Sequence, residues 1–244
     1  MSFTDQYFDA VHDVIADIRS QEGEPIAAAA DLLAATLRRD GLLYVFGCGH
    51  SHLVEEELFY RAGGLAPVCP MFDTATMLHE GAAKSSLIER QSGYASLVAD
   101  RYPLGEKDCL LVASTSGINP FAIEMAQIAR ARGAAVIGVS SFAYRAKPSR
   151  HPEGLHLPDV CDVCIDNHVQ VGDASVPVRA DGTKAGPTSS IATLLIANLV
   201  VLAACERLRA AGQEPEVFLS GNCEGSGEHN AELVRRFSAR VRSL

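Results

Sequence analysis

The fold class follows from the stretch Val112-Ala113-Ser114-Thr115-Ser116-Gly117-Ile118-Asn119-Pro120, which indicates a buried strand that ends in a hydroxyl-rich loop and opens a helix. Asn119 suits the N-cap and Pro120 suits the first helical position. The free N–H groups of the next turn and the positive end of the helix dipole then point at the loop, where three hydroxyl side chains precede Gly117. Gly117 lets the backbone come close to an oxyanion. The stretch therefore predicts a phosphate site, although a plain strand-to-helix turn has the same pattern.

A second loop has the same character. Gly47-Cys48-Gly49-His50-Ser51-His52 follows the apolar run 42–46 and precedes a helical segment, residues 53–61. In open α/β sheets, ligands lie beyond the carboxyl ends of the strands, where two such loops meet. The loop lacks the third glycine and the acidic residue of a dinucleotide-binding fingerprint. The pair of loops therefore favours a phosphorylated ligand over a nicotinamide cofactor.

Helices and strands are expected to alternate along the chain, as a doubly wound sheet requires. The expected helices cover residues 11–18, 26–39, 53–61, 120–132 and 189–211, with a last helix from about 228 and another to about 100 that the capping box Ser86-x-x-Glu89 begins. The expected strands cover residues 42–46, 66–69, 109–113, 135–140 and 161–165, and residues 142–158 and 167–187 are loops. This predicts a single α/β domain over residues 1–244, with a five-stranded parallel sheet flanked by helices.

Composition narrows the cellular context and the partners. The formal net charge of −9 over 244 residues argues against nucleic acid as a partner. Seven cysteines, an odd number, and the absence of a signal peptide indicate a reducing, cytoplasmic location. Cys161 and Cys164 have CxxC spacing, but no second pair completes a zinc site. Because neutral donors of the two loops are expected to hold the phosphate, we expect no metal and no cofactor, and activity that survives a chelator.

The longest apolar run, Ile191–Cys205, is shorter than a membrane span of about 20 residues. It is apolar on every face and has small residues interleaved, so one side is expected to pack on the sheet and another on a second subunit. The run predicts a homodimer with its sites near the interface and no membrane partner.

The order and spacing of the two loops resemble the sugar isomerase (SIS) domain family, whose members bind phosphorylated sugars. The resemblance extends from about Val11 to the C-terminus, and the stretches GHSHLVEEELFYRAGG and LHEGAAKSSLIERQSGYA are similar to a subfamily of stand-alone bacterial SIS proteins. It implies a flavodoxin-like SIS fold. The expected phosphate ligands are Ser51, Ser114, Thr115, Ser116 and Asn119, and the residues expected beside the sugar are Gly49, His50, His52 and Glu56.

Glu55, Glu56 and Glu57 lie in the first turns of a helix, where the dipole favours negative charge without any catalytic role. Glu57 also stands four residues before Arg61, the spacing of an ordinary surface ion pair. However, the segment EELFYR resembles the EELxxR of phosphoheptose isomerases, in which the second Glu works at the sugar. The resemblance implies a catalytic role for Glu57 ahead of Glu56.

Glu80 lies in the segment His79-Glu80-Gly81-Ala82, where an acidic side chain is usually just solvated. The segment resembles the EGAED of N-acetylmuramic acid 6-phosphate etherases, which use that Glu to remove a proton from sugar carbon 2. This chain has Ala83-Lys84 where the etherases have Glu-Asp, so the lactyl-ether substrate does not carry over. The resemblance implies that Glu80 is a base, with Glu57 as the assisting acid. Partial burial is expected to raise the pKa of both carboxyls.

Histidines supply the remaining candidates, and each has an ordinary structural alternative. His79 adjoins Glu80, and His229 opens the last helix after a glycine-rich segment. SIS isomerases often take a histidine from the C-terminal part of a partner subunit, which implies that role for His229. Arg150 and His151 either cover the ligand or are simply solvated.

Three functions remain open. The first is a lyase that eliminates water or an alkoxide from an N-acetylhexosamine 6-phosphate after removal of the C2 proton. The second is an aldose–ketose isomerase of a sugar phosphate, and the third is a sugar-phosphate sensor without catalysis. Sensors in transcription regulators usually carry a DNA-binding domain, and only about 40 residues precede the first expected strand. We therefore expect the lyase first.

Overall fold

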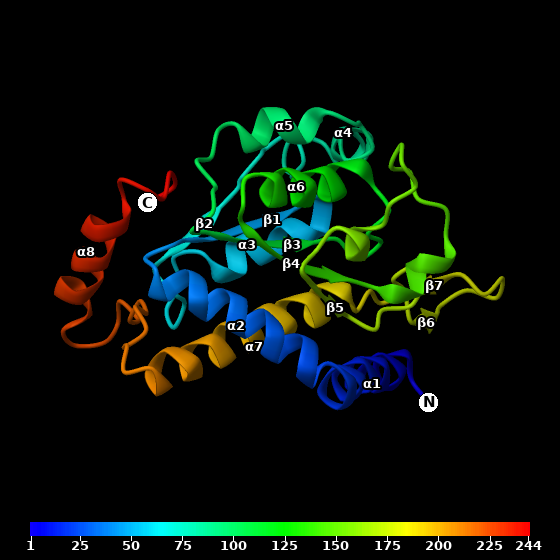
Figure 1. Cartoon of the computed structure of the whole chain (residues 1–244). Coiled ribbons are helices and arrows are strands. Elements are labelled where there is room, and N and C mark those ends of the chain that lie inside the picture. Colours follow the sequence, from blue (N-terminus) through cyan, green and yellow to red (C-terminus); the bar gives the residue numbers. More distant parts are fainter.

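The computed structural model describes residues 1–244 and places five parallel strands in one sheet, in the order β2-β1-β3-β4-β5 (Figure 1). The strands are β1 (Leu43–Gly47), β2 (Val68–Pro70), β3 (Cys109–Ala113), β4 (Ala135–Ser140) and β5 (Val163–Asp166). The predicted fold class, a doubly wound five-stranded parallel sheet, is confirmed.

Helices cover both faces of the sheet (Figure 1). One face carries α1 (Phe3–Gln21), α2 (Gly23–Arg38), α3 (Leu53–Leu58) and α7 (Ser189–Ala210). The other carries α4 (Ala82–Ile88), α5 (Tyr94–Ala99), α6 (Pro120–Ala131) and α8 (Ser226–Phe237). The smaller elements are the 3-10 helices η1 (Gly49–His52), η2 (Phe142–Ala146) and η3 (Leu157–Asp159), and a hairpin of β6 (Val176–Pro177) with β7 (Lys184–Ala185).

The core lies in two layers that share the sheet. In β1, Tyr44 and Phe46 pack toward α5 and α6, whereas Leu43 and Val45 pack toward α2 and α7. A parallel strand that is buried on both faces has a continuous apolar sequence, which explains why these strands were predictable. The sheet is therefore a fixed platform for the loops at its carboxyl edge.

The strand order places the topological switch point between β1 and β3. The chain leaves β1 toward β2 on one side of the sheet, and β3, β4 and β5 follow on the other side. Ligands of doubly wound sheets bind in the crevice outside the strand ends at such a point. Both loops that the sequence analysis singled out begin there, after Gly47 and after Ala113.

Two helix starts were wrong. The first helix begins at Phe3 instead of Val11, because Ser2 and Asp5 form a capping box there. Ser86 lies inside α4, which begins at Ala82, and Glu89 is the C-cap of that helix, so no capping box begins there. The helix starts early because Ser85 packs inward and donates its hydroxyl to the Thr76 carbonyl, at 2.6 Å. Gly93, with a φ of 87°, then separates α4 from α5. The helix expected over residues 53–61 also ends early, at Leu58.

By length and composition alone, α7 is the one helix that is apolar enough to cross a membrane, with a mean hydropathy of 1.9. Its residues Ala192, Ile196 and Val200 are fully buried against the sheet, as in a core helix. Leu202 and Ile191, by contrast, remain exposed by 61% and 40%. The contact of α7 with a second subunit stays a prediction.

Candidate functional site

A small pocket lies where the β1 loop, the β3 loop and the start of α7 meet. Nine residues line it: His50, Ser51, Leu53, Val54, Thr115, Ser189, Ser190, Thr193 and Leu194. Five of these side chains carry hydroxyl groups, and none is acidic. The first turn of the 22-residue helix α7 adds the positive end of its dipole. These features suit an oxyanion that is held by neutral donors.

Of the five expected phosphate ligands, Ser51 and Thr115 line the pocket, whereas Ser114, Ser116 and Asn119 do not. Their role at a phosphate stays a prediction, and the pocket adds donors that the sequence analysis missed. Ser189, Ser190 and Thr193 belong to α7, far from both loops in the sequence. The signal for them was the run of hydroxyl residues before a long apolar helix, which marks a helix start but does not say what that start faces.

The β3 loop is held in shape by its neighbours. The Gly117 N–H donates to Ser114 Oγ at 3.2 Å, and the Thr115 carbonyl accepts from the Ser141 N–H at 2.9 Å. Gly117 has a φ of 60°, and a Cβ there would lie 2.5 Å from Ser140 Oγ. Glycine is therefore required at this position by both conformation and space.

Asn119 occupies the N-cap position of α6, but its side chain does not cap the helix. Its Oδ1 instead accepts from Arg150 Nη1 at 2.9 Å. This contact brings the guanidinium of the long loop next to the β3 loop, but neither Asn119 nor Arg150 lines the pocket. The predicted N-cap is correct in backbone geometry, whereas the capping hydrogen bond is absent.

Glu55 is the carboxyl that the sequence analysis passed over. It is 1% exposed, its Oε1 accepts from the Gly47 N–H at 2.9 Å, and its Oε2 has no hydrogen-bond partner. Burial raises the pKa of Glu55 well above its usual range, and the Gly47 N–H only partly opposes this. Glu55 therefore favours its protonated form, and it supports the β1 loop by accepting a hydrogen bond from the Gly47 N–H.

Glu55→Gln should make the stability of the protein less dependent on pH. The folded chain keeps the Glu55 proton at pH values where the unfolded chain has lost it, so stability is full below the unfolded pKa of about 4.3 and falls as pH rises toward the raised folded pKa. The loss is up to about 1.4 kcal/mol per pH unit in that window. In urea unfolding between pH 5 and pH 8, we expect the free energy of unfolding of Glu55→Gln to rise relative to that of the wild type as pH increases. Glu56→Gln, a change at the exposed neighbouring position, should show no such rise. A wild-type-like pH slope in Glu55→Gln would contradict the assignment.

Glu57 points toward α7. It forms the predicted ion pair with Arg61, and its Oε1 accepts from Asn198 Nδ2 at 2.8 Å. The ordinary ion pair that the Glu57–Arg61 spacing predicts is therefore confirmed. A proton donor at this position stays a prediction.

Glu80 is exposed and pairs with Lys84 at 3.0 Å, one helical turn further on. Hydrogen bonds from Lys84 and Thr74 lower the pKa of Glu80. The expected upward shift is therefore wrong for this carboxyl in the single chain, because the hydrogen bond and charge of Lys84, which replaces the etherase Asp, outweigh the small effect of desolvation. Glu80 is an ionised carboxylate.

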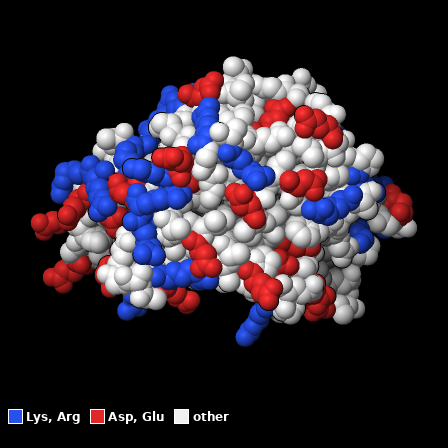
Figure 2. Space-filling view, viewed as in Figure 1, with Lys and Arg blue, Asp and Glu red and all other residues white.

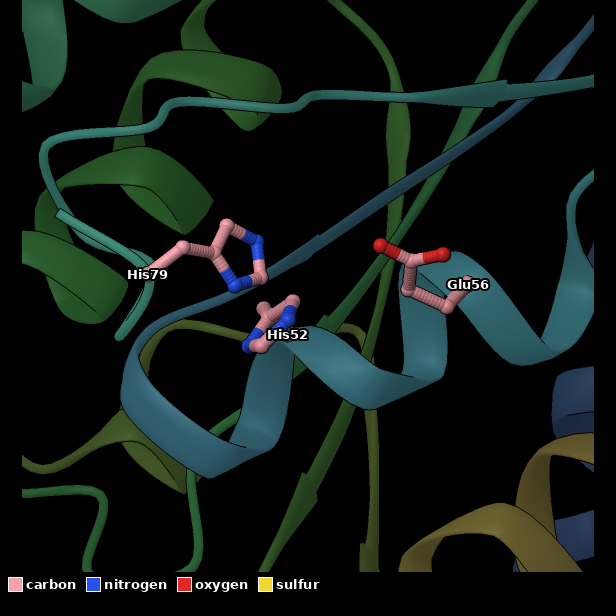
Figure 3. Close-up of side chains that lie close together, drawn as sticks. All are labelled: His52, Glu56 and His79. Atoms are coloured by element: carbon pink, nitrogen blue, oxygen red, sulfur yellow. The ribbon is translucent and has the colours of Figure 1, made fainter.

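Three of the predicted residues converge beside the β1 loop. Figure 3 shows His52 and Glu56 on successive turns at the start of α3, with His79 facing them from the loop after β2. The two imidazole rings meet edge to face, with centroids 5.3 Å apart and planes at 85°. Their spacing is close enough for all three side chains to bind one small ligand or ion.

His229 lies near the opposite end of the molecule from the pocket. Its Nε2 is 2.9 Å from the Val217 carbonyl, and α8 packs beside the turn that precedes β1, where Arg240 pairs with Asp40 (Figure 1). The pocket is at the carboxyl ends of the strands, so His229 does not reach the pocket of its own chain. A contribution to the pocket of a second copy stays a prediction.

Residues 6–141 match the family model of the SIS domain, and this range contains both loops of the pocket. The chain belongs to the SIS domain family. This SIS domain protein is 39% identical over 236 residues to the UPF0309 protein BH0227 of Halalkalibacterium halodurans, with 96% of this chain and 94% of the relative covered. It is 40% identical over 238 residues to a UPF0309 protein of Geobacillus thermodenitrificans, with coverage of 97% and 96%.

Solved structures share the SIS fold at low identity. A phosphoheptose isomerase from Francisella tularensis matches with a TM-score of 0.56 and 19% identity, covering 83% of this chain and 96% of that one. The Vibrio vulnificus NanR protein, complexed with ManNAc-6P, matches with a TM-score of 0.52 and 15% identity, covering 97% of this chain and 70% of that one. At these identities the likeness establishes the fold.

Proposed function

We propose that this SIS domain protein is a phosphosugar lyase that removes water from an N-acetylhexosamine 6-phosphate. The observation that carries the proposal is the hydroxyl-lined pocket at the switch point, where Ser51 and Thr115 meet the first turn of α7. The NanR complex adds support, because a protein of this fold holds a phosphorylated N-acetylhexosamine. The phosphate enters this pocket and the sugar chain extends toward His79 and Glu80.

The chemistry begins at the open-chain sugar, whose C1 carbonyl acidifies the hydrogen on C2. The ionised Glu80 carboxylate takes this proton, and the electron pair of the C–H bond forms an enolate. The enolate then collapses to restore the carbonyl, a C2–C3 double bond forms, and the C3–O bond breaks. Glu57 gives its proton to the departing hydroxide, which leaves as water. His79 adjoins the base and orients the carbonyl.

The solved phosphoheptose isomerases favour a second candidate, aldose–ketose isomerisation. It shares the first step, because both reactions begin with removal of the C2 proton. With a free hydroxyl on C2, the enediol takes a proton at C1 and no bond to C3 breaks. With an N-acetyl group on C2, this route is disfavoured and elimination takes over.

A panel of sugar 6-phosphates in D₂O tests the proposal. We expect N-acetylglucosamine 6-phosphate or N-acetylmannosamine 6-phosphate to exchange its C2 proton, by NMR, and to lose the mass of one water. Conversion of a 2-hydroxy aldose phosphate to its ketose, with N-acetylated sugars untouched, would establish the isomerase instead. Binding of these sugars without any exchange would leave a sensor.

Ser116→Ala should weaken binding of the sugar phosphate by about 10-fold to 100-fold, because one hydrogen bond to a charged group contributes about 1.5–3 kcal/mol. The fold should survive, since the Ser116 side chain makes no hydrogen bond within the chain. Calorimetry with N-acetylglucosamine 6-phosphate measures the loss, and Ser86→Ala on the exposed side of α4 is the control. Unchanged affinity would remove the Ser116 side chain from the phosphate site.

We also infer a cytoplasmic homodimer that joins through α7. Leu202 and Ile191 leave an apolar outer side on this helix, and all seven cysteines are free thiols. Sedimentation velocity at micromolar concentration should show a species of twice the mass of the chain, and Leu202→Glu should shift it to the monomer. Leu97→Glu, an equally exposed leucine on α5, is the control. A monodisperse wild-type monomer would contradict the interface and leave His229 without a site.

Nucleic acid is not among the proposed partners. Figure 2 shows basic side chains gathered mainly over the end of the molecule where α8 lies, and acidic side chains interrupt them there. The net charge of −9 also opposes contact with a phosphate backbone. A small phosphorylated sugar needs only the local donors of the pocket.

A further inference from the structure

Two segments that are separate in the sequence bring three possible metal ligands together in the fold. His52 and Glu56 stand on one side of α3 at an i, i+4 spacing, and His79 approaches from the loop between β2 and α4 (Figure 3). One ligand atom from each residue lies within 4.8 Å of the other two. A single ion can therefore be reached by all three side chains after small rotations.

The lack of other partners singles these residues out. The neighbouring carboxylates are all engaged: Glu55 with the Gly47 N–H, Glu57 with Arg61, and Glu80 with Lys84. Glu56 and His79 form no ion pair and no side-chain hydrogen bond. An anionic carboxylate and an imidazole that face each other without a partner suit a shared cation.

The hydrogen bond of His52 prepares it as a ligand. Its Nδ1 bonds the Gly49 carbonyl, which can only accept, so Nδ1 carries the proton and Nε2 keeps a free lone pair. Metal-binding histidines commonly donate their other N–H to a carbonyl in this way, which fixes the tautomer and the orientation of the ring. His52 is also 5% exposed, so its position is set by packing.

The donor set selects the kind of ion. Mg²⁺ and Ca²⁺ prefer oxygen ligands, whereas imidazole suits zinc and its neighbours in the transition series. Two histidines and one glutamate form a three-ligand set that leaves a fourth position open. We propose that His52, Glu56 and His79 bind a divalent transition-metal ion of the zinc class.

An ion here would tie the loop that carries Glu80 to the helix that follows Ser51. It would give His79 a positioning role. It would also replace the expectation of a metal-free site, which rested on neutral phosphate donors and on the incomplete CxxC pattern. The inference does not depend on the proposed reaction, because the ligands and their geometry are present without a sugar. The two ideas can therefore fail separately.

The test uses the full chain, stripped with a chelator and free of sugar. Calorimetry with Zn²⁺ should give one site per chain, and Co²⁺ should produce the strong visible absorption of a four-coordinate ion. His79→Ala and Glu56→Gln, both at exposed positions, should each weaken Zn²⁺ binding by more than the roughly 10-fold to 100-fold cost of losing an outer hydrogen-bond partner of a ligand. His12→Ala removes an exposed imidazole from α1 and should change nothing.

Circular dichroism of each variant confirms that it is folded before titration. Absence of a stoichiometric site in the wild type would overturn the proposal. Binding that is unchanged in both His79→Ala and Glu56→Gln would also overturn it, because the ion would then be held elsewhere. Deuterium exchange of the sugar panel, measured on separate samples, reports on the lyase reaction whatever the outcome for the metal.

Discussion

Glu80→Gln should abolish both deuterium exchange at C2 and loss of water from an N-acetylhexosamine 6-phosphate, while the sugar phosphate still binds. Glutamine keeps the shape of the side chain and its hydrogen bond from Lys84 but cannot accept a proton. General-base catalysis contributes about 10²-fold to 10⁴-fold, so the exchange rate should fall by at least that range. NMR in D₂O measures exchange, mass spectrometry measures elimination, and calorimetry confirms binding.

Two further variants test whether the effect is specific to Glu80. Glu57→Gln should stop elimination yet leave some exchange, because enolate formation precedes departure of the C3 group. Glu228→Gln, an exposed acid on α8, should leave both rates at the wild-type value. Full exchange in Glu80→Gln would assign the base to another group, and equal loss of exchange in Glu57→Gln would place Glu57 in the first step.

The sheet and its two loops could be predicted from local sequence because their signals are local. The run 109–113 is apolar throughout and the run 135–140 is apolar up to Ser140, and the predicted bounds match β3 and β4 to the residue. The N-cap geometry of Asn119 and the first helical position of Pro120 depend on the adjacent backbone alone. The family resemblance added the flavodoxin-like SIS fold and the expectation of a phosphosugar.

The electrostatic state of the glutamates could not be predicted in the same way. Glu55, Glu56 and Glu57 are consecutive, yet one is buried and neutral, one is unpaired at the surface, and one bonds α7. A helix turns about 100° per residue, so neighbours in sequence face different surroundings. Which face meets the β1 loop depends on where α3 packs, and no local pattern reports that.

The approach of α7 and His79 to the β1 loop is likewise tertiary. Ser189 and Ser190 reach the pocket because α7 crosses beneath the sheet with its first turn at the carboxyl edge. His79 meets His52 because the Gly49 N–H donates to the Thr76 carbonyl at 2.9 Å, which docks the two loops together. Neither contact could be predicted from a sequence spacing, because each joins segments that are distant in the sequence.

Gly47→Ala should cost about 100-fold or more in affinity for the sugar phosphate without touching any predicted ligand. A Cβ at this position would lie 2.3 Å from the Ser51 carbonyl oxygen and 2.5 Å from the Ser51 carbonyl carbon. These are backbone atoms, so no side chain can rotate away and the turn η1 itself must move. The shift would carry Ser51 and His50 out of the pocket together.

The size of this effect follows from the number of donors lost. Each hydrogen bond to a charged group contributes about 1.5–3 kcal/mol, so displacing a turn that supplies two of them costs about 3 kcal/mol or more. Overpacking of this kind also destabilises the fold by about 1–3 kcal/mol, so urea unfolding accompanies the calorimetry. Gly105→Ala is the matched control, because a Cβ there meets nothing within 4 Å. Wild-type affinity in a folded Gly47→Ala protein would show that the phosphate does not use the β1 loop, and the pocket would then belong to the β3 loop and α7 alone.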